Sequence, residues 1–120
     1  MTPKERILAV EDKSTLDLGE RQLTFYHGRG HANHHLTILD NLTNGLFSGD
    51  LLGIYAPEFA KYDIEYSLLS SAPSQFDPQA FSQSLDRIRS LRPNIIYFSH
   101  FGIKTGLTDH YIDLCLKNLE

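Results

Sequence analysis

Apolar residues in the first half of the chain alternate with polar ones or form short runs, as they do in strands. Residues 21–27 read RQLTFYH, in which Leu23 and Phe25 are separated by one polar residue, the period of two that is typical of a strand. Short apolar runs between polar or glycine-containing turns predict further strands at residues 6–12, 14–20 and 34–40, and one that starts at residue 46. This part of the chain is therefore predicted to be rich in β structure.

The pattern changes after residue 75, where a helix is predicted. Asp77 and Pro78 form a typical helix start, because aspartate accepts hydrogen bonds from the free amides and proline fits the first turn. The apolar residues that follow recur at spacings of three or four, as on one face of a helix: Phe81, Leu85, Ile88 and Leu91. Pro93 is expected to end this helix.

A strand and a second helix are predicted to complete the chain. Residues 94–100, NIIYFSH, form a nearly continuous apolar run, which indicates a buried strand. The last helix should begin near Thr108 and bury one apolar side, made by Tyr111, Leu114, Cys115 and Leu119. We expect both helices to pack on the same side of one sheet, so the fold class is α/β.

Composition narrows the possible functions. The chain has 120 residues, 41% of them hydrophobic, which suits one domain spanning residues 1–120. A net charge of -4 argues against nucleic acid as a partner, and no apolar stretch is long enough to span a membrane. A single cysteine, Cys115, and an N-terminus without the apolar core of a secretion signal predict a cytoplasmic protein.

Candidate chemistry is found at the ends of three predicted strands. His31 lies in GRGHA, Asp50 in FSGD and His100 in FSHFG, each with a glycine beside it or close by. Imidazole and carboxylate together suit zinc, iron or manganese. The three are 19 and 50 residues apart, so only the fold could bring them together. The alternative is that each is a polar residue that satisfies local backbone groups.

These segments resemble a known family. FYHGRGHANHHLTILDNLTNGLFSGDLLG resembles the third and fourth metal-ligand motifs of the metallo-β-lactamase superfamily, and IIYFSHFG resembles the fifth. The resemblance, closest to glyoxalase II-like enzymes, implies an αββα sandwich that hydrolyses ester, thioester or lactone substrates with one or two zinc ions. It implies that His31 binds one metal, that Asp50 bridges two metals and takes part in catalysis, and that His100 binds the second metal.

The resemblance covers only the C-terminal half of that fold. The family's His-x-His-x-Asp-His motif does not occur in the sequence, so four of the usual seven ligands are missing. We therefore expect one sheet with helices on one side and a weak or inactive hydrolase, completed by a homodimer or by a missing N-terminal half. The alternative is a non-catalytic, self-associating remnant that acts as a binding or structural module.

Other candidate residues have competing interpretations. By the same resemblance Tyr55, Glu58 and Phe59 bind the small-molecule substrate, whereas the alternative is a packed loop. If His34 and His35 lie in a strand, they point to opposite faces and at most one approaches the site. His27 is interpreted as structural or as a support for the ligands, and Cys115 as a buried thiol.

Overall fold

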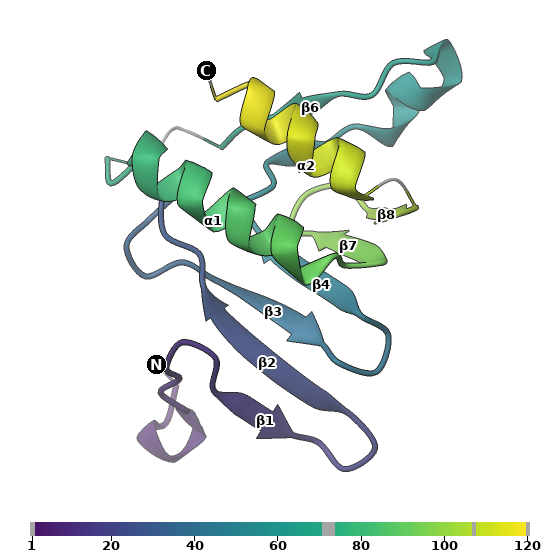
Figure 1. Ribbon diagram of the computed structural model, residues 1–120. Helices are drawn as coiled ribbons and strands as arrows, with labels where there is room; N and C mark the ends of the chain where they lie inside the picture. The colour runs from purple at the N-terminus through teal and green to yellow at the C-terminus, as the bar shows by residue number, and fades with distance from the viewer. Residues whose placement is uncertain (1, 71–73, 107, 120) are drawn as a thin grey trace.

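The computed structural model describes residues 2–70, 74–106 and 108–119, and these residues contain one mixed six-stranded sheet (Figure 1). In sheet order its strands are β1 (Thr15–Asp17), β2 (Gln22–His27), β3 (Leu36–Asp40), β4 (Gly45–Gly49), β7 (Ile95–Phe98) and β8 (Ile103–Thr105). Neighbouring strands are antiparallel except β4 and β7, which are parallel. A parallel pair places both C-terminal strand ends at the same edge of the sheet.

Outside this sheet, the described residues contain two 3-10 segments and two short strands, which pair with each other in a separate two-stranded sheet. They are η1 (Lys4–Arg6), β5 (Ile54–Tyr55), η2 (Pro57–Tyr62) and β6 (Ser67–Leu68). The predicted strand at residues 6–12 is wrong, because Ile7 and Leu8 pair with no strand and are each 62% exposed. An apolar run predicts a strand only where a neighbouring strand can accept its backbone hydrogen bonds.

Both predicted helices are present, α1 (Pro78–Leu91) and α2 (Thr108–Lys117). The Asp77 side chain accepts a hydrogen bond from the Ala80 amide at 3.0 Å, as expected of a helix start. Arg92 closes α1 in the left-handed region, with φ of 48°, directly before Pro93. Both helices lie on the same face of the sheet, which confirms the predicted α/β arrangement (Figure 1).

The core lies between the helices and this face of the sheet. Leu39, Leu46 and Ile96 lie side by side across β3, β4 and β7 and are buried. The helix residues packed in the same core are Phe81, Leu85, Ile88, Tyr111, Ile112 and Cys115. The buried positions of α2 are 108, 111, 112 and 115, which lie on one side of the helix. Ile112 is therefore a core residue, whereas Leu114, which was predicted to be buried, is only half-buried.

The opposite face of the sheet carries a second apolar row, which we call the open row. Phe25, Ile38, Phe47, Tyr97 and Ile103 are paired in turn across β2, β3, β4, β7 and β8. Because side chains alternate along a strand, the open row faces away from both helices. Phe47 and Tyr97 stack with their ring centroids 4.6 Å apart, yet Phe47 is 43% exposed.

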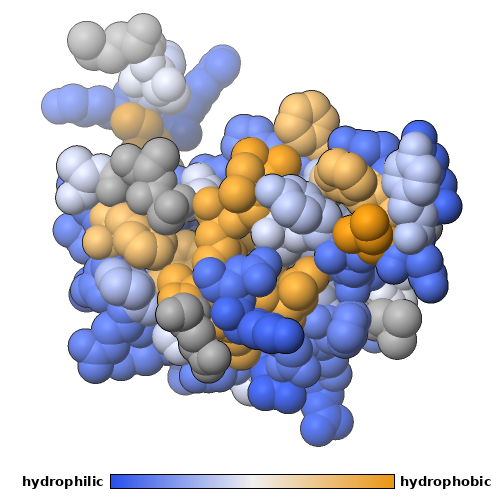
Figure 2. All heavy atoms as spheres, turned by 90° about the horizontal axis from the view of Figure 1, so that it is seen from above, coloured by the Kyte–Doolittle hydropathy of each residue, from blue (hydrophilic) through white to orange (hydrophobic). Residues whose placement is uncertain are grey.

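The helix side of the molecule has a mixed surface. Figure 2 shows hydrophobic residues near the centre of the face seen from above in Figure 1, bordered by hydrophilic residues. A hollow of about 470 Å³ between β6 and the end of α2 is lined by residues of both kinds: Ser67, Leu68, Leu69, Phe76, Asn118 and Leu119. Among the described helices, none combines the length and the apolar character that a bilayer crossing requires.

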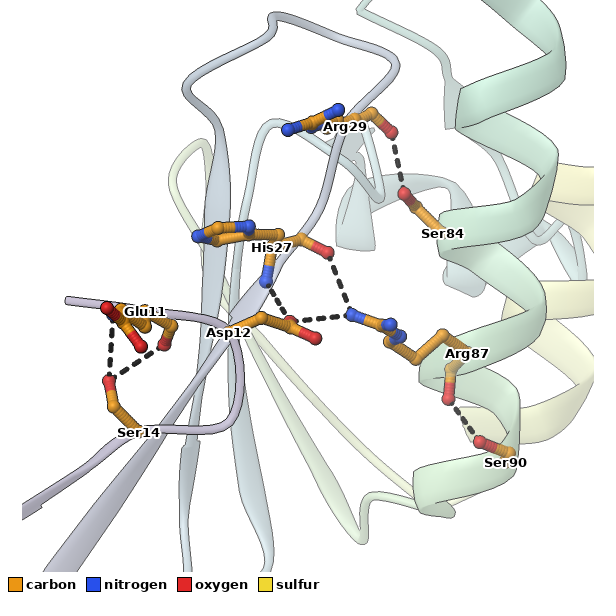
Figure 3. A network of polar contacts seen from close by, with 8 residues as sticks. All are labelled: Glu11, Asp12, Ser14, His27, Arg29, Ser84, Arg87 and Ser90. Atoms are coloured by element: carbon orange, nitrogen blue, oxygen red, sulfur yellow. Dashed lines mark hydrogen bonds and ion pairs between the residues drawn. The ribbon is translucent and has the colours of Figure 1, made fainter.

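A polar network connects Asp12, in the segment before β1, to β2 and to α1 (Figure 3). Asp12 Oδ1 accepts hydrogen bonds from the His27 amide at 2.8 Å and from Arg87 Nη1 at 2.7 Å. Arg87 also donates to the His27 carbonyl at 3.4 Å. The His27 amide and, to a lesser extent, Arg87 lower the pKa of Asp12 against the opposing effect of burial. His27 thus supports the fold through its backbone.

Candidate metal centre

The loop that carries His31 is held against the first turns of α1. The Asp77 amide donates to the Gly30 carbonyl at 2.8 Å, and Ser84 Oγ donates to the Arg29 carbonyl at 2.6 Å (Figure 3). Gly30 has φ of 125°, and a side chain there would collide with the backbone of Phe81. Only glycine therefore allows this close approach, which fixes where His31 emerges.

The orientation of His31 follows from its hydrogen bond to Ser70. His31 Nδ1 lies 2.7 Å from the Ser70 carbonyl oxygen. A carbonyl only accepts, so Nδ1 carries the hydrogen and donates it, which leaves a lone pair on Nε2 of the neutral ring. His31 Nε2 lies 3.6 Å from Asp50 Oδ2. An imidazole whose other nitrogen is held in this way has the usual form of a metal ligand.

Asp50 lies between two imidazoles. It directly follows β4, and His100 follows β7, so the parallel pairing of these strands brings the two side chains together. His100 Nε2 lies 2.9 Å from Asp50 Oδ1. That oxygen is nevertheless buried without a hydrogen bond to any described residue. The sheet thus gathers all three predicted ligands at one edge, around a carboxylate oxygen that lacks a hydrogen bond.

A fourth histidine, His35, supports Asp50 from behind. The Asp50 amide donates to His35 Nε2 at 3.0 Å, and the rings of His31 and His35 meet edge to face with centroids 5.7 Å apart. Burial, and then the nearby His31, lower the pKa of His35 and favour its neutral form. Gly49 has φ of 55°, and a methyl group at this position would collide with the His35 ring.

Of His34 and His35, His35 contacts Asp50 and His34 is exposed, which agrees with the prediction that at most one of them approaches the site. Both lie in a turn before β3, so their placement in a strand was wrong. The four-residue spacing from His31 to His35 and the Gly-Asp corner were the only sequence signals for the contact between His35 and Asp50.

The donor atoms of His31, Asp50 and His100 are spaced as the ligands of a metal ion are, but they are too few for a complete site. Two ligands of a tetrahedral zinc lie about 3.3 Å apart, given metal–ligand distances near 2.0 Å. The separations of 3.6 Å and 2.9 Å from Asp50 to His31 and His100 lie on either side of this value. Within the described ranges, however, no three His, Cys, Asp or Glu side chains form a group that could hold a metal ion. The chain offers two donor pairs that share Asp50.

The predicted substrate-binding residues are not gathered in one place. Tyr55 stacks on Phe98 at 4.9 Å and helps to line a hollow of about 370 Å³ beside Glu65 and Lys104, which form an ion pair. Glu58 and Phe59 belong to η2, are exposed, and do not line this hollow.

Cys115 is unsuited to nucleophilic chemistry. It is buried in the core, and its sulfur lies 3.2 Å from Ser67 Oγ. Burial raises the pKa of the Cys115 thiol to about 12, so the reactive thiolate is not populated near neutral pH. The prediction of a buried structural thiol is confirmed.

Comparison with known proteins gives a consistent result. A family model described as "Metallo-beta-lactamase superfamily" matches residues 1–100. A metallo-beta-lactamase fold-containing protein of Sulfurisphaera tokodaii is 27% identical over 100 residues, which are 83% of this chain and 34% of that protein.

Solved structures share the fold. An archaeal metallo-beta-lactamase superfamily protein from Sulfolobus tokodaii superposes with a TM-score of 0.76 at 25% identity, over 95% of this chain and 40% of that one. A metallo-beta-lactamase family protein from Thermus thermophilus gives 0.70 at 19% identity, over 92% and 34% of the two chains. A metallo-beta-lactamase from Pontibacter korlensis gives 0.68 at 18%, over 92% and 46%. The chain thus spans a third to a half of the length of these relatives.

Proposed function

The chain belongs to the metallo-β-lactamase superfamily, and we propose that it supplies one half of a hydrolytic metal centre, built from His31, Asp50 and His100. Members of this superfamily typically bind metal ions. The proposed metal is zinc, with iron or manganese as alternatives that the same ligands accept. The proposed substrates are small esters, thioesters or lactones, as in glyoxalase II-like enzymes, in a cytoplasmic setting.

Each of the three side chains has a distinct part in this proposal. His31 presents a fixed Nε2 lone pair because Ser70 holds its other nitrogen. Asp50 offers one oxygen toward each imidazole and so connects the two donor pairs. His100 is the most exposed of the three, with a side chain 49% exposed, and faces the solvent side. When bound, zinc would supply a water molecule of lowered pKa and would polarise the substrate carbonyl.

The observation that carries the proposal is the state of Asp50 Oδ1. A buried carboxylate oxygen without a hydrogen bond is unfavourable, because the lost hydration is not replaced. Among the described residues His100 Nε2 lies 2.9 Å from this oxygen but makes no hydrogen bond to it, and an atom in this state in a native fold calls for an explanation, such as a bound ion. With two imidazole nitrogens close by, a metal cation fits this need.

Activity from a single chain should be low. A catalytic zinc normally has three protein ligands, whereas each donor pair here provides two. Tyr55 is the proposed substrate contact, whereas Glu58 and Phe59 lie exposed in η2. A complete centre would need further ligands from another polypeptide segment.

Metal titration tests the proposal. The metal-free chain is titrated with cobalt, as a spectroscopic substitute for zinc, and with zinc by calorimetry. We expect saturable binding that His31→Ala, Asp50→Ala and His100→Ala each weaken. His34→Ala is the matched control, because His34 is an exposed histidine of the same segment that is not one of the three proposed ligands. Binding that is absent, or equally strong in all four variants, would overturn the proposal.

The same proteins are then assayed for hydrolysis of a thioester and a lactone with added zinc. We expect rates close to background for the single chain. Robust turnover that His31→Ala or His100→Ala abolishes would show instead that the centre is already complete.

A further inference from the structure

We propose that Asn44 is a site of spontaneous chemical modification, at which the side-chain amide is lost by reaction with the backbone of Gly45 and a carboxylate takes its place. Asn44 is the last residue of the turn between β3 and β4, and Gly45 is the first residue of β4. The inference involves no metal and goes beyond the function proposed above.

The packing of the sheet requires glycine at position 45. A Cβ atom added there would lie 2.5 Å from Tyr97 Cε2 and 2.9 Å from Thr43 Oγ1, closer than real Cβ contacts come. The Tyr97 ring is stacked on Phe47 with centroids 4.6 Å apart, so it cannot move aside without losing this contact. The fold therefore selects the one residue whose backbone nitrogen is not shielded by its own side chain.

The turn favours asparagine at position 44. Asn44 has φ of 51°, in the left-handed region that asparagine adopts more readily than most residues. Its Nδ2 donates to the Arg92 carbonyl at 2.8 Å, and its own carbonyl accepts from the Asn94 amide at 2.9 Å. Asn44 thus joins this turn to the segment between α1 and β7. The two residues that the fold selects stand in the order that the reaction needs.

The reaction uses only this pair of residues and water. The Gly45 nitrogen gives its proton to the solvent and forms a bond to Asn44 Cγ, and the side-chain nitrogen takes up a proton and leaves as ammonia. Water then breaks one of the two C–N bonds of the cyclic imide, which leaves aspartate or isoaspartate at position 44. The oxidation state of every atom is unchanged, so no oxidant or reductant is required.

The other asparagines of the chain are less open to this reaction. Each of them precedes histidine, leucine or isoleucine, whose side chains crowd the attacking nitrogen. At Asn44 the reaction requires the side chain to leave the Arg92 carbonyl, and this hydrogen bond lies at the surface. Local opening of a surface turn costs far less free energy than global unfolding. We therefore expect the modification to proceed in the folded chain.

The product should weaken the contact between the turn and the end of α1. A carboxylate has no hydrogen to donate, so the Arg92 carbonyl loses its partner and faces a second acceptor. Isoaspartate also lengthens the backbone by one carbon atom directly before β4. Both products thus disturb the same joint.

Mass spectrometry of the full chain, kept in warm and mildly alkaline buffer, tests the proposal. Trypsin cuts after Arg29 and Lys61, so one peptide carries Asn33, Asn41 and Asn44. We expect the amide of Asn44 to be lost several times faster than the other two, and an isoaspartate-specific methyltransferase to label the product. An Asn44 that stays intact in the folded chain, even if it reacts in urea, would overturn the proposal. Equal rates at all three asparagines would do so as well.

Asn44→Gly is the matched control for the chemistry. Glycine also adopts positive φ but has no side-chain amide, so this variant should fold, which circular dichroism checks, and should lose the isoaspartate label. A label that persists in the folded variant would place the reaction elsewhere and overturn the proposal.

Asn44→Asp carries the carboxylate of the product from the start. We expect it to unfold at a lower urea concentration than freshly prepared wild type. Asn33→Asp makes the same change at a residue that, among those described, forms its hydrogen bond through the backbone amide, and should unfold like wild type. No loss in Asn44→Asp, or an equal loss in both variants, would refute the weakening of the joint.

Discussion

His31 Nε2 lies 3.6 Å from Asp50 Oδ2, and neither atom has a hydrogen to give the other in the neutral ring. The reason is that the His31 hydrogen is donated from Nδ1 to the Ser70 carbonyl at 2.7 Å. Two acceptors held this close repel unless a proton, a water molecule or a cation lies between them. The proposed metal site rests on this relationship and on the buried Asp50 Oδ1, for which the alternative of polar residues that only satisfy a loop gives no reason.

The helix layer should depend strongly on Phe81. Its side chain is fully buried between α1 and the sheet, so Phe81→Ala should lower the free energy of unfolding by about 3–5 kcal/mol. Urea unfolding followed by circular dichroism measures this change. Phe59→Ala removes a phenyl ring that is 39% exposed, so it should lower the free energy of unfolding by clearly less than Phe81→Ala does. Equal costs would mean that the core has been assigned to the wrong face.

A substitution at Gly49, which is not one of the proposed ligands, should lower the affinity for zinc. Gly49→Ala would push the His35 ring away from the Asp50 amide, which now donates to it. We expect zinc affinity to fall about 10- to 100-fold, as is typical when a support behind a ligand is lost. Gly106→Ala is the control, because Gly106 also has positive φ (69°) but no neighbouring atom near an added methyl group. Equal losses in both variants would show that backbone strain alone is responsible.

Acid should weaken the attachment of the N-terminal segment. The pKa of Asp12 is lowered in the folded chain, so Asp12 contributes stability above its unfolded pKa, near 3.8, and loses it as pH falls through the folded value. Asp12→Asn should therefore be less stable than wild type at neutral pH and nearly equal to it in strong acid. Urea unfolding across this pH range measures the difference. Asp86→Asn, an exposed change on α1, should leave the pH profile unaltered.

Local patterns were sufficient for most of the fold. Period-two alternation located β2, and the Asp77–Pro78 start with its four-three-three spacing located α1. The failures came where tertiary context decides. The apolar run at residues 7–10 finds no neighbouring strand, and β5, β6 and β8 are too short to show a period. In α2 both Ile112 and Leu114 are apolar, so the sequence pattern alone does not decide which of them faces the core. The structure buries Ile112 and leaves Leu114 half-buried.

The convergence of the three candidate ligands was predictable, but the contacts around them were not. Glycine-flanked strand ends identified His31, Asp50 and His100, because parallel strands β4 and β7 must end at one edge. The hydrogen bond from Asp50 to His35 was not predictable, since it depends on a turn whose conformation has no periodic signal. Glu58 and Phe59 were placed by resemblance alone, and the structure keeps both outside the hollow beside Tyr55.

The central claim is that Asp50 connects two metal-binding imidazoles, and anomalous diffraction from crystals soaked in zinc tests it most directly. The account predicts a zinc peak within coordination distance, about 2.0–2.2 Å, of Asp50 and of His31 or His100. Glu65 and His110, which approach to 3.4 Å on the surface, provide an internal comparison for adventitious binding. A peak only at Glu65 and His110, or no peak near Asp50 at saturating zinc, would contradict the account.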